Sequence, residues 1–497
     1  MQEVLDPARP ATWQQLKKLN PSAQKVWLHK HFKEIREALT ALDHTFLTFI
    51  GNLCVNNNLY QEAEYIFDEL YKKGHKQHDL ASTAAYSRGI TRFLQGRFQD
   101  AFADFKISRQ HDLQRRDFNA PSAQAIAYME DTLFPTRETI RKNQVKLLRD
   151  LNAPRAINHV IGPNILRIMR KWNSSSPLFS HGVSQGGGYF LTTKDRHGET
   201  KGIVIDPGYA FFDIFRDLGL GISDIDAIII THDHDDHTDS VEGILSLLAK
   251  HNDHNDLKRS KVIDIFGSAG TMLKFNGLLP ATDPNGNREI NFKLLVPGSL
   301  VTEIGGEGLL DKYGFTISVK PAHHTEFWTN QESSVGLVLN TNLPYNAGEP
   351  LKIGLTGDTR YEVGLGLEYQ EAQVIMLNIG SVEKEEGRPL KQHLGMLGCI
   401  NLLKEARLGK TTLAILTEFG EEFSGRRETI SHIIENWAQA IDVSRGSQLK
   451  VIPSDVHLEI RLTDLHIRET GSGIFFPCRQ IRVDESDPEV LKYKFNG

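Results

Sequence analysis

The spacing of apolar positions along the chain changes near residue 150. Between residues 21 and 150 apolar side chains recur about every 3.6 residues, as in Phe32, Ile35 and Leu42, which is the period of an amphipathic helix. Beyond residue 156, short runs rich in β-branched residues alternate with Gly, Pro and Asn, which predicts strands with intervening helices. We therefore expect an α+β protein, with an all-α domain over 1–150 and a second domain over 156–497.

The second domain is predicted to contain many short strands. The expected strands lie at residues 165–170, 189–193, 202–205, 227–231, 315–320, 335–340, 352–355, 374–378, 412–417 and 449–453. The expected helices lie at about 209–219, 239–251, 395–408 and 426–442. Strands mixed with helices in this way favour two sheets that are flanked by helices.

A repeat runs through the helical domain. Residues 58–67 match residues 96–105 at an offset of 38. The corresponding positions are Gly51 with Gly89, Ala63 with Ala101, and Phe67 with Phe105. Small residues let the two helices of a hairpin approach each other, and the aromatic ring fills the gap to the next hairpin. Flanking helices at about 21–42 and 121–150 would then cap the stack.

This pattern resembles the tetratricopeptide repeat, whose period is about 34 residues, so four additional residues are expected between the repeats, within 72–79. The resemblance implies a concave surface that binds a protein partner of unknown identity. A module for packing or dimerisation is the alternative, and the sequence does not separate the two.

Composition narrows the classes of function. The chain has 57 Lys and Arg against 63 Asp and Glu, a net charge of −6, which gives no general attraction to nucleic acid or anionic membranes. Three widely spaced cysteines exclude a disulfide framework and a Cys-rich zinc module. No apolar run approaches the ~18 residues that span a bilayer. The N-terminus also lacks the apolar core of a secretion signal. We expect a cytoplasmic protein that does not associate with membranes.

Four residues able to bind metal ions directly follow the predicted strand at 227–231. His232 and His234 are two positions apart and face the same way in an extended segment, and Asp236 and His237 come one turn later. Such a cluster can present ligands to two metal ions that share a water molecule and lower its pKa. A polar loop with chance histidines is the alternative, and the density of ligands after a buried strand argues against it.

The run resembles the His-x-His-x-Asp-His motif of the metallo-β-lactamase superfamily, whose other motifs follow here in the family's order. The resemblance implies an αββα sandwich. It also implies that Asp206, in Asp-Pro-Gly, orients the His-rich loop without binding metal. In Pro-Ala-His-His-Thr the next ligand is His324 or His323. The family frame favours His324, and His323 would then be a neighbour of the site or a substrate contact. Asp358, in Gly-Asp-Thr-Arg, would bridge both metal ions.

The last metal ligand is left open between two residues. In tRNase Z, a member of this superfamily, a histidine that acts on the scissile phosphate precedes a strand that ends in the last ligand histidine. His393 falls on the first of these positions, and Glu418 falls on the second. A carboxylate can bind zinc or manganese, although it is a harder ligand than imidazole. We favour Glu418 as the ligand and His393 as an acid or a substrate contact.

The resemblance implies a binuclear hydrolase with two divalent metal ions, zinc or else manganese, and a metal-bound hydroxide as the nucleophile. Asp236 would hold the second ion and accept a proton, and His393 would assist the leaving group. Arg360 either touches a phosphate or forms a local salt bridge. The motifs favour a phosphodiester in nucleic acid or a nucleotide. Two alternatives stay open: hydrolysis of a lactone, amide, thioester or phospholipid, and a helical scaffold or regulator with a sensory metal domain.

Overall fold

The computed structural model describes most of the chain. The described residues are 10–38, 42–151, 153–173, 185–253, 260–282, 286, 288–345, 348–383, 388–406, 413–440, 449–487 and 490–495. The ends of the helices expected at 395–408 and 426–442, and the start of the strand expected at 412–417, lie outside them. The chain divides into two compact units, residues 1–147 and 148–497. None of the described helices has the length and apolar character needed to cross a membrane.

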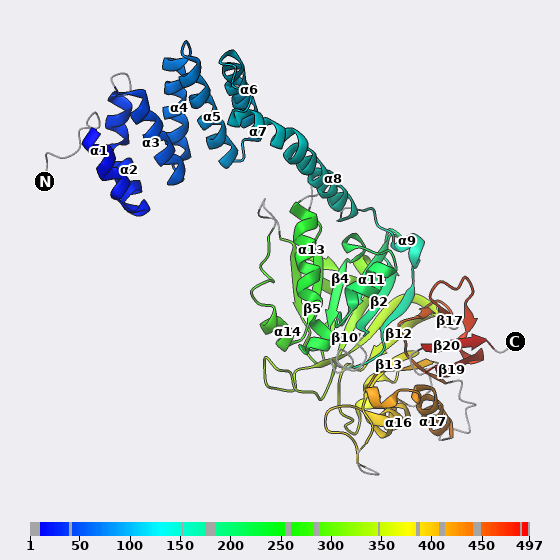
Figure 1. Cartoon of the computed structure of the whole chain (residues 1–497). Helices are drawn as coiled ribbons and strands as arrows, with labels where there is room; N and C mark the ends of the chain where they lie inside the picture. The colour runs from blue at the N-terminus through cyan, green and yellow to red at the C-terminus, as the bar shows by residue number, and fades with distance from the viewer. Residues whose placement is uncertain are drawn as a thin grey trace. The chain divides into compact units, whose positions relative to one another are not determined.

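The first unit is helical throughout its described residues (Figure 1). Its helices are α1 (Pro10–Lys18), α2 (Pro21–Ala38), α3 (His44–Asn56), α4 (Tyr60–Gly74), α5 (His78–Leu94), α6 (Phe98–Gln114) and α7 (Pro121–Tyr128). A π-helical turn, Met129–Leu133, then leads into α8 (Phe134–Leu151), which continues into the second unit. Helices α3 to α6 each pack against the next one along the chain.

The two repeated hairpins have the same internal packing. The ring of Phe67 lies so close to Gly51 that a Cβ at that glycine would come within 2.6 Å of it, and Phe105 lies at the same distance from Gly89. Ala101 is fully buried, as is its counterpart in the first hairpin. Helix α5 has 17 residues and α3 has 13. The four additional residues therefore form an additional turn at the start of α5.

The second unit contains two large sheets. The first has the strand order β18 (Phe476–Pro477), β17 (His466–Glu469), β16 (Leu458–Arg461), β1 (Ile165–Arg170), β2 (Gly186–Lys194), β3 (Thr200–Ile205), β4 (Ala227–Ile230), β5 (Ile263–Gly267), β6 (Ile290–Leu294). The second has the order β15 (Lys450–Pro453), β14 (Leu413–Phe419), β13 (Val374–Gly380), β12 (Glu349–Leu355), β11 (Val335–Tyr345), β10 (Phe315–Pro321), β7 (Leu300–Val301). Two hairpins, β8–β9 (Glu303–Ile304, Glu307–Gly308) and β19–β20 (Ile481–Asp487, Val490–Phe495), complete the strands.

The layers follow from where the apolar side chains lie. One core cluster joins the facing surfaces of the two sheets, with Leu191 and Ile203 from the first and Leu337 from the second. Separate clusters lie under the outer helices. Helices α11 (Phe211–Asp217) and α13 (Val241–Asp253) cover the first sheet, and α16 (Gly395–Glu405) and α17 (Arg427–Ala440) cover the second (Figure 1). The predicted αββα sandwich is confirmed.

The central strands bring the predicted ligands to one edge. β3 runs parallel to β4, and β12, β13 and β14 are parallel to one another. The carboxyl ends of parallel strands meet at one edge of a sheet, so residues that follow these strands share that edge. Asp206, His232 and Asp358 follow β3, β4 and β12, and Glu418 is the last residue but one of β14.

Candidate metal centre

Three imidazoles form the first half of the centre, which we call the imidazole group: His232, His234 and His324. One ring nitrogen from each lies within 4.8 Å of the other two. Nε2 of His324 is 3.2 Å from Nδ1 of His234. The structure thus places His324 among the imidazoles. It turns His323 away, with Nδ1 3.3 Å from Oε2 of Glu332.

The second nitrogen of each imidazole is held by a polar group. Nδ1 of His324 lies 3.0 Å from the carbonyl oxygen of Gln392, and Nε2 of His234 lies 3.1 Å from that of Thr325. A carbonyl only accepts, so these nitrogens carry the proton and the opposite nitrogens present lone pairs. Burial holds the pKa of His232 well below its usual value, helped by His237, and burial also lowers the pKa of His234. The rings of His232 and His234 are therefore neutral, as metal ligation requires.

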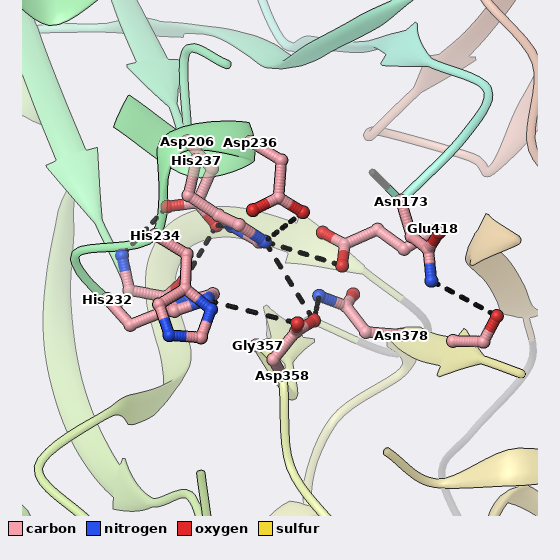
Figure 2. A network of polar contacts seen from close by, with 12 residues as sticks. Asn173, Asp206, His232, His234, Asp236, His237, Gly357, Asp358, Asn378 and Glu418 are labelled. Carbon is pink, nitrogen blue, oxygen red and sulfur yellow. Dashed lines mark hydrogen bonds and ion pairs between the residues drawn. The ribbon is translucent and has the colours of Figure 1, made fainter. Parts of the chain in front are cut away.

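Carboxylates surround one further imidazole in the second half, the carboxylate group: Asp236, His237, Asp358 and Glu418 (Figure 2). Nε2 of His237 lies 3.5 Å from Oε2 of Glu418, 3.6 Å from Oδ2 of Asp236 and 3.9 Å from Oδ1 of Asp358. The other oxygen of Asp358 lies 3.9 Å from Nε2 of His232 and 3.8 Å from Nε2 of His324. Asp358 therefore lies between the two groups.

Asp206 contacts residues in or next to both groups and is not itself a member of either. It accepts from the amide and the hydroxyl of Thr231, each at 2.8 Å, and that hydroxyl lies 3.1 Å from Nδ1 of His232. Its Oδ2 is also 3.0 Å from Nδ1 of His237. Asp206 has a φ of +49°, and a Cβ at Gly208 would come within 1.7 Å of the carbonyl oxygen of Asp236. The strained backbone and the missing side chain let the two loops pack this closely.

A buried arginine, Arg170 at the end of β1, contacts the carboxylate group. Its Nη1 lies 2.5 Å from Oε1 of Glu418 and 3.2 Å from Nε2 of His237, and its Nη2 donates to the carbonyl oxygen of Asp236. Burial raises the pKa of Glu418 to about 8, an effect that Arg170 opposes and Asp358 reinforces. Burial acts to lower the pKa of His237, but Glu418 and other carboxylates raise it well above its usual value.

His393 lies at the open side of the centre. Its Nδ1 is 3.6 Å from Oδ2 of Asp358, and its side chain is 24% exposed. Neither His393 nor Asp236 belongs to any of the three-residue ligand groups found among the described residues, whereas Glu418 belongs to one with Asp206 and His237. Arg360 points to Glu332 and to Glu362, whose Oε1 is 2.8 Å from its Nε.

Part of this chain matches a known protein family. Residues 201–417 match the family model described as a β-lactamase superfamily domain. These residues therefore form a β-lactamase superfamily domain. The unit that contains them therefore has the metallo-β-lactamase fold. No curated protein matches the sequence.

Solved structures of three proteins are similar in fold. The metallo-β-lactamase fold protein YhfI from Bacillus subtilis is 14% identical, with 59% of this chain and 98% of that one covered and a TM-score of 0.41. A long form of RNase Z from yeast is 14% identical, with coverage of 52% and 37% and a TM-score of 0.37. The short form of human tRNase Z is 15% identical, with coverage of 62% and 100% and a TM-score of 0.34.

The donor atoms of this β-lactamase superfamily domain fit divalent metal ions. Ligand atoms ~2.0–2.2 Å from a tetrahedral ion lie about 3.3–3.6 Å apart. Nε2 of His237 lies 3.5 Å from Oε2 of Glu418 and 3.6 Å from Oδ2 of Asp236, and Nε2 of His324 lies 3.2 Å from Nδ1 of His234. Nε2 of His232 and Oε2 of Glu418 are buried, and neither has a hydrogen-bond partner in the described parts of the chain. Buried polar atoms are rarely left unpaired. Asp358 is suited to bridge two ions, because it faces both groups.

The sequence did not reveal several residues of the domain's site. Arg170 ends an apolar strand 248 residues before its partner Glu418, and Asn378 donates to Oδ1 of Asp358 at 3.1 Å from the end of β13. Phe327 stacks on His234 of the imidazole group and Trp328 follows it in the chain; they are 72% and 58% exposed. Their amides donate to the buried carboxylate of Asp233 at 3.0 and 2.7 Å. Two adjacent aromatics after the His-His-Thr segment were the available signal.

Proposed function

We propose that this protein is a two-metal phosphodiesterase that acts on a nucleotide or on nucleic acid. His232, His234 and His324 would hold one ion, Asp236, His237 and Glu418 the other, and Asp358 both. Bound divalent ions, zinc or manganese, supply an activated water and offset the charge of a phosphate. The observation that carries the proposal is the position of His393 at the open side of the centre.

His393 borders a hollow of about 660 Å³ that is also lined by Arg388 and Lys391. Cationic side chains beside an imidazole suit a phosphate diester, because they attract the phosphate while the imidazole donates a proton to the leaving oxygen. Among the three carboxylates, Asp236 is the most exposed, at 16%, against 4% or less for the other two. Asp236 is therefore the carboxylate best placed to accept a proton from water.

The exposed aromatics support a substrate with a flat ring. The ring of Phe327 stacks on His234, with centroids 4.0 Å apart and planes 26° from parallel. The hydrogen bonds to Asp233 fix the backbone of Phe327 and Trp328 against the segment that carries His234. Bases of single-stranded nucleic acid stack on aromatic side chains in this way.

Purified protein loaded with zinc or manganese tests the reaction. It should hydrolyse bis-p-nitrophenyl phosphate and leave a panel of lactones and thioesters intact; the reverse preference contradicts the proposal. Trp328→Ala should raise KM for a dinucleotide and leave KM for bis-p-nitrophenyl phosphate nearly unchanged. The matched control is Trp437→Ala, because Trp437 is similarly exposed, at 57%, on α17.

We also propose that the helical unit binds a protein partner, on the support of its two repeated hairpins. Removal of residues 1–147 should then leave turnover of bis-p-nitrophenyl phosphate largely intact and abolish the effect of the protein in the cell. Loss of turnover in a folded, metal-loaded fragment contradicts this proposal.

A further inference from the structure

A positively charged side chain, that of Arg170, lies against the carboxylate group. The side chain of Arg170 is 0% exposed and pairs with Glu418, which is equally buried. A buried charge is stable only when it is paired and hydrogen-bonded, so the roles of these two residues are coupled. Arg170 also donates to the carbonyl oxygen of Asp236 and so contacts two of the segments that supply ligands.

The two oxygens of Glu418 face different partners. Oε1 lies 2.5 Å from Nη1 of Arg170, and Oε2 lies 3.5 Å from Nε2 of His237. Oε2 has no hydrogen-bond partner among the residues that the structure describes. A carboxylate that is held through one oxygen presents the other in a fixed direction. Glu418 is therefore oriented to bind a cation through Oε2.

The charges give Arg170 a second role. Two divalent ions carry four positive charges, and Asp236, Asp358 and Glu418, which must be ionised to bind metal, then carry three negative charges. A carboxylate at position 418 makes the net charge of the ions and their ligands one unit more negative than a neutral imidazole would. The positive charge of the guanidinium cancels this difference. We propose that Arg170 and Glu418 together form one electrically neutral ligand of the second metal ion. This inference rests on the two-metal centre of the proposed function and is independent of the substrate.

A different arrangement is the main competitor. Nη1 of Arg170 lies 3.2 Å from Nε2 of His237, so the guanidinium itself could take the place of the second ion. The contacts favour our proposal, because a guanidinium only donates and here leaves Oε2 of Glu418 without a partner. Nε2 of His237 also lies 3.5 Å from Oε2 of Glu418 and 3.6 Å from Oδ2 of Asp236, which are distances found between ligand atoms of one ion.

Zinc titration of the full-length protein against a chelator tests the proposal without any substrate. The variants are Arg170→Met, Glu418→His and the double variant. Because each change alters the charge beside the second ion by one, its affinity should rise about 10- to 100-fold in Arg170→Met and fall as much in Glu418→His. The double variant should return to the wild-type affinity. Arg170→Lys keeps the charge and should stay within about threefold of wild type.

Two controls make the result decisive. Arg427→Met removes another fully buried arginine, which pairs with Asp455 and Glu485, and should leave both affinities unchanged. Occupancy of the imidazole group reports whether each variant is folded. If Glu418→His fails to fold, the comparison of Arg170→Lys with Arg170→Met still decides between charge and mere packing.

Three results overturn the proposal. A double variant that binds the second ion no better than Glu418→His shows that the two residues are not compensating. Loss of the second ion in Arg170→Met shows that the guanidinium only positions Glu418. A wild-type protein that binds one ion, with a second gained in Arg170→Met, shows that the guanidinium occupies the second position. If the affinities follow the expected order but phosphodiesters are not cleaved, only the proposed reaction is wrong.

Discussion

The two halves of the metal centre hold their ligands by different means. In the imidazole group the ligands are imidazoles, and carbonyl oxygens such as those of Gln392 and Thr325 fix the orientation of the rings. In the carboxylate group three acidic side chains surround His237, and a buried guanidinium balances part of their charge. Neutral ligands need only correct orientation, whereas buried carboxylates need counter-charges as well. The second half should therefore be the more sensitive to changes of charge.

The largest effect should come from removing the imidazole group. The double variant His232→Ala, His234→Ala should lose most of its metal, relative to about two ions per chain in the wild-type protein. Elemental analysis after dialysis measures this loss. The control is His432→Ala, His457→Ala, since both histidines are exposed residues of the same unit. If the His232, His234 variant retained two ions, the assignment of the imidazole group as metal ligands would be wrong.

The next largest effect should separate a ligand from a catalytic residue. His393→Ala should keep both ions and slow turnover by roughly 10²–10⁴-fold, the usual size of a general acid contribution. Glu418→Ala should instead lose the second ion, because it removes a carboxylate from that half. Metal content and kcat of the two variants, measured side by side, decide the question. If Glu418→Ala keeps both ions and His393→Ala loses one, then His393 is the metal ligand and Glu418 is not.

Asp206→Asn should weaken both halves at once. Asp206 contacts Thr231 beside His232 and also faces His237, so the amide would disturb a ligand in each group. Loss of such an orienting partner typically lowers metal affinity by about 10- to 100-fold. Asp213→Asn on the exposed face of α11 is the control. A drop confined to one of the two ions would contradict the linking role of Asp206.

The smallest effect should lie wholly outside the centre. Ala101→Leu should overpack the second repeated hairpin and lower the free energy of unfolding of the helical unit by about 1–3 kcal/mol. Thermal unfolding measures the loss, with the exposed Ala127→Leu of α7 as control. Metal content should not change. A stabilised Ala101→Leu protein would refute the tight crossing expected from the repeat.

Local patterns explain which features the sequence could predict. The ligands after β4 and β12 were found because a buried strand and the polar residues that follow it are adjacent in sequence. The role of Arg170 was missed because its partners come from other strands, 248 residues away in the case of Glu418. Strands such as β17 and β19 were also missed, because His466–Glu469 and Ile481–Asp487 carry more polar than apolar residues. Pairing with neighbours, not their own pattern, makes these segments strands.

The order of the ligands along the chain also sets an order in time. The imidazole group is complete once residue 324 has been synthesised, whereas the carboxylate group waits for residue 418 and for the contact that β14 makes with β1. Contacts between distant segments form late in folding, because closing a long loop costs entropy before any contact repays it. A nascent chain thus acquires a site for one ion well before it can hold two. Addition of β14 to the second sheet, which brings Glu418 to the centre, is then the step that completes the metal site.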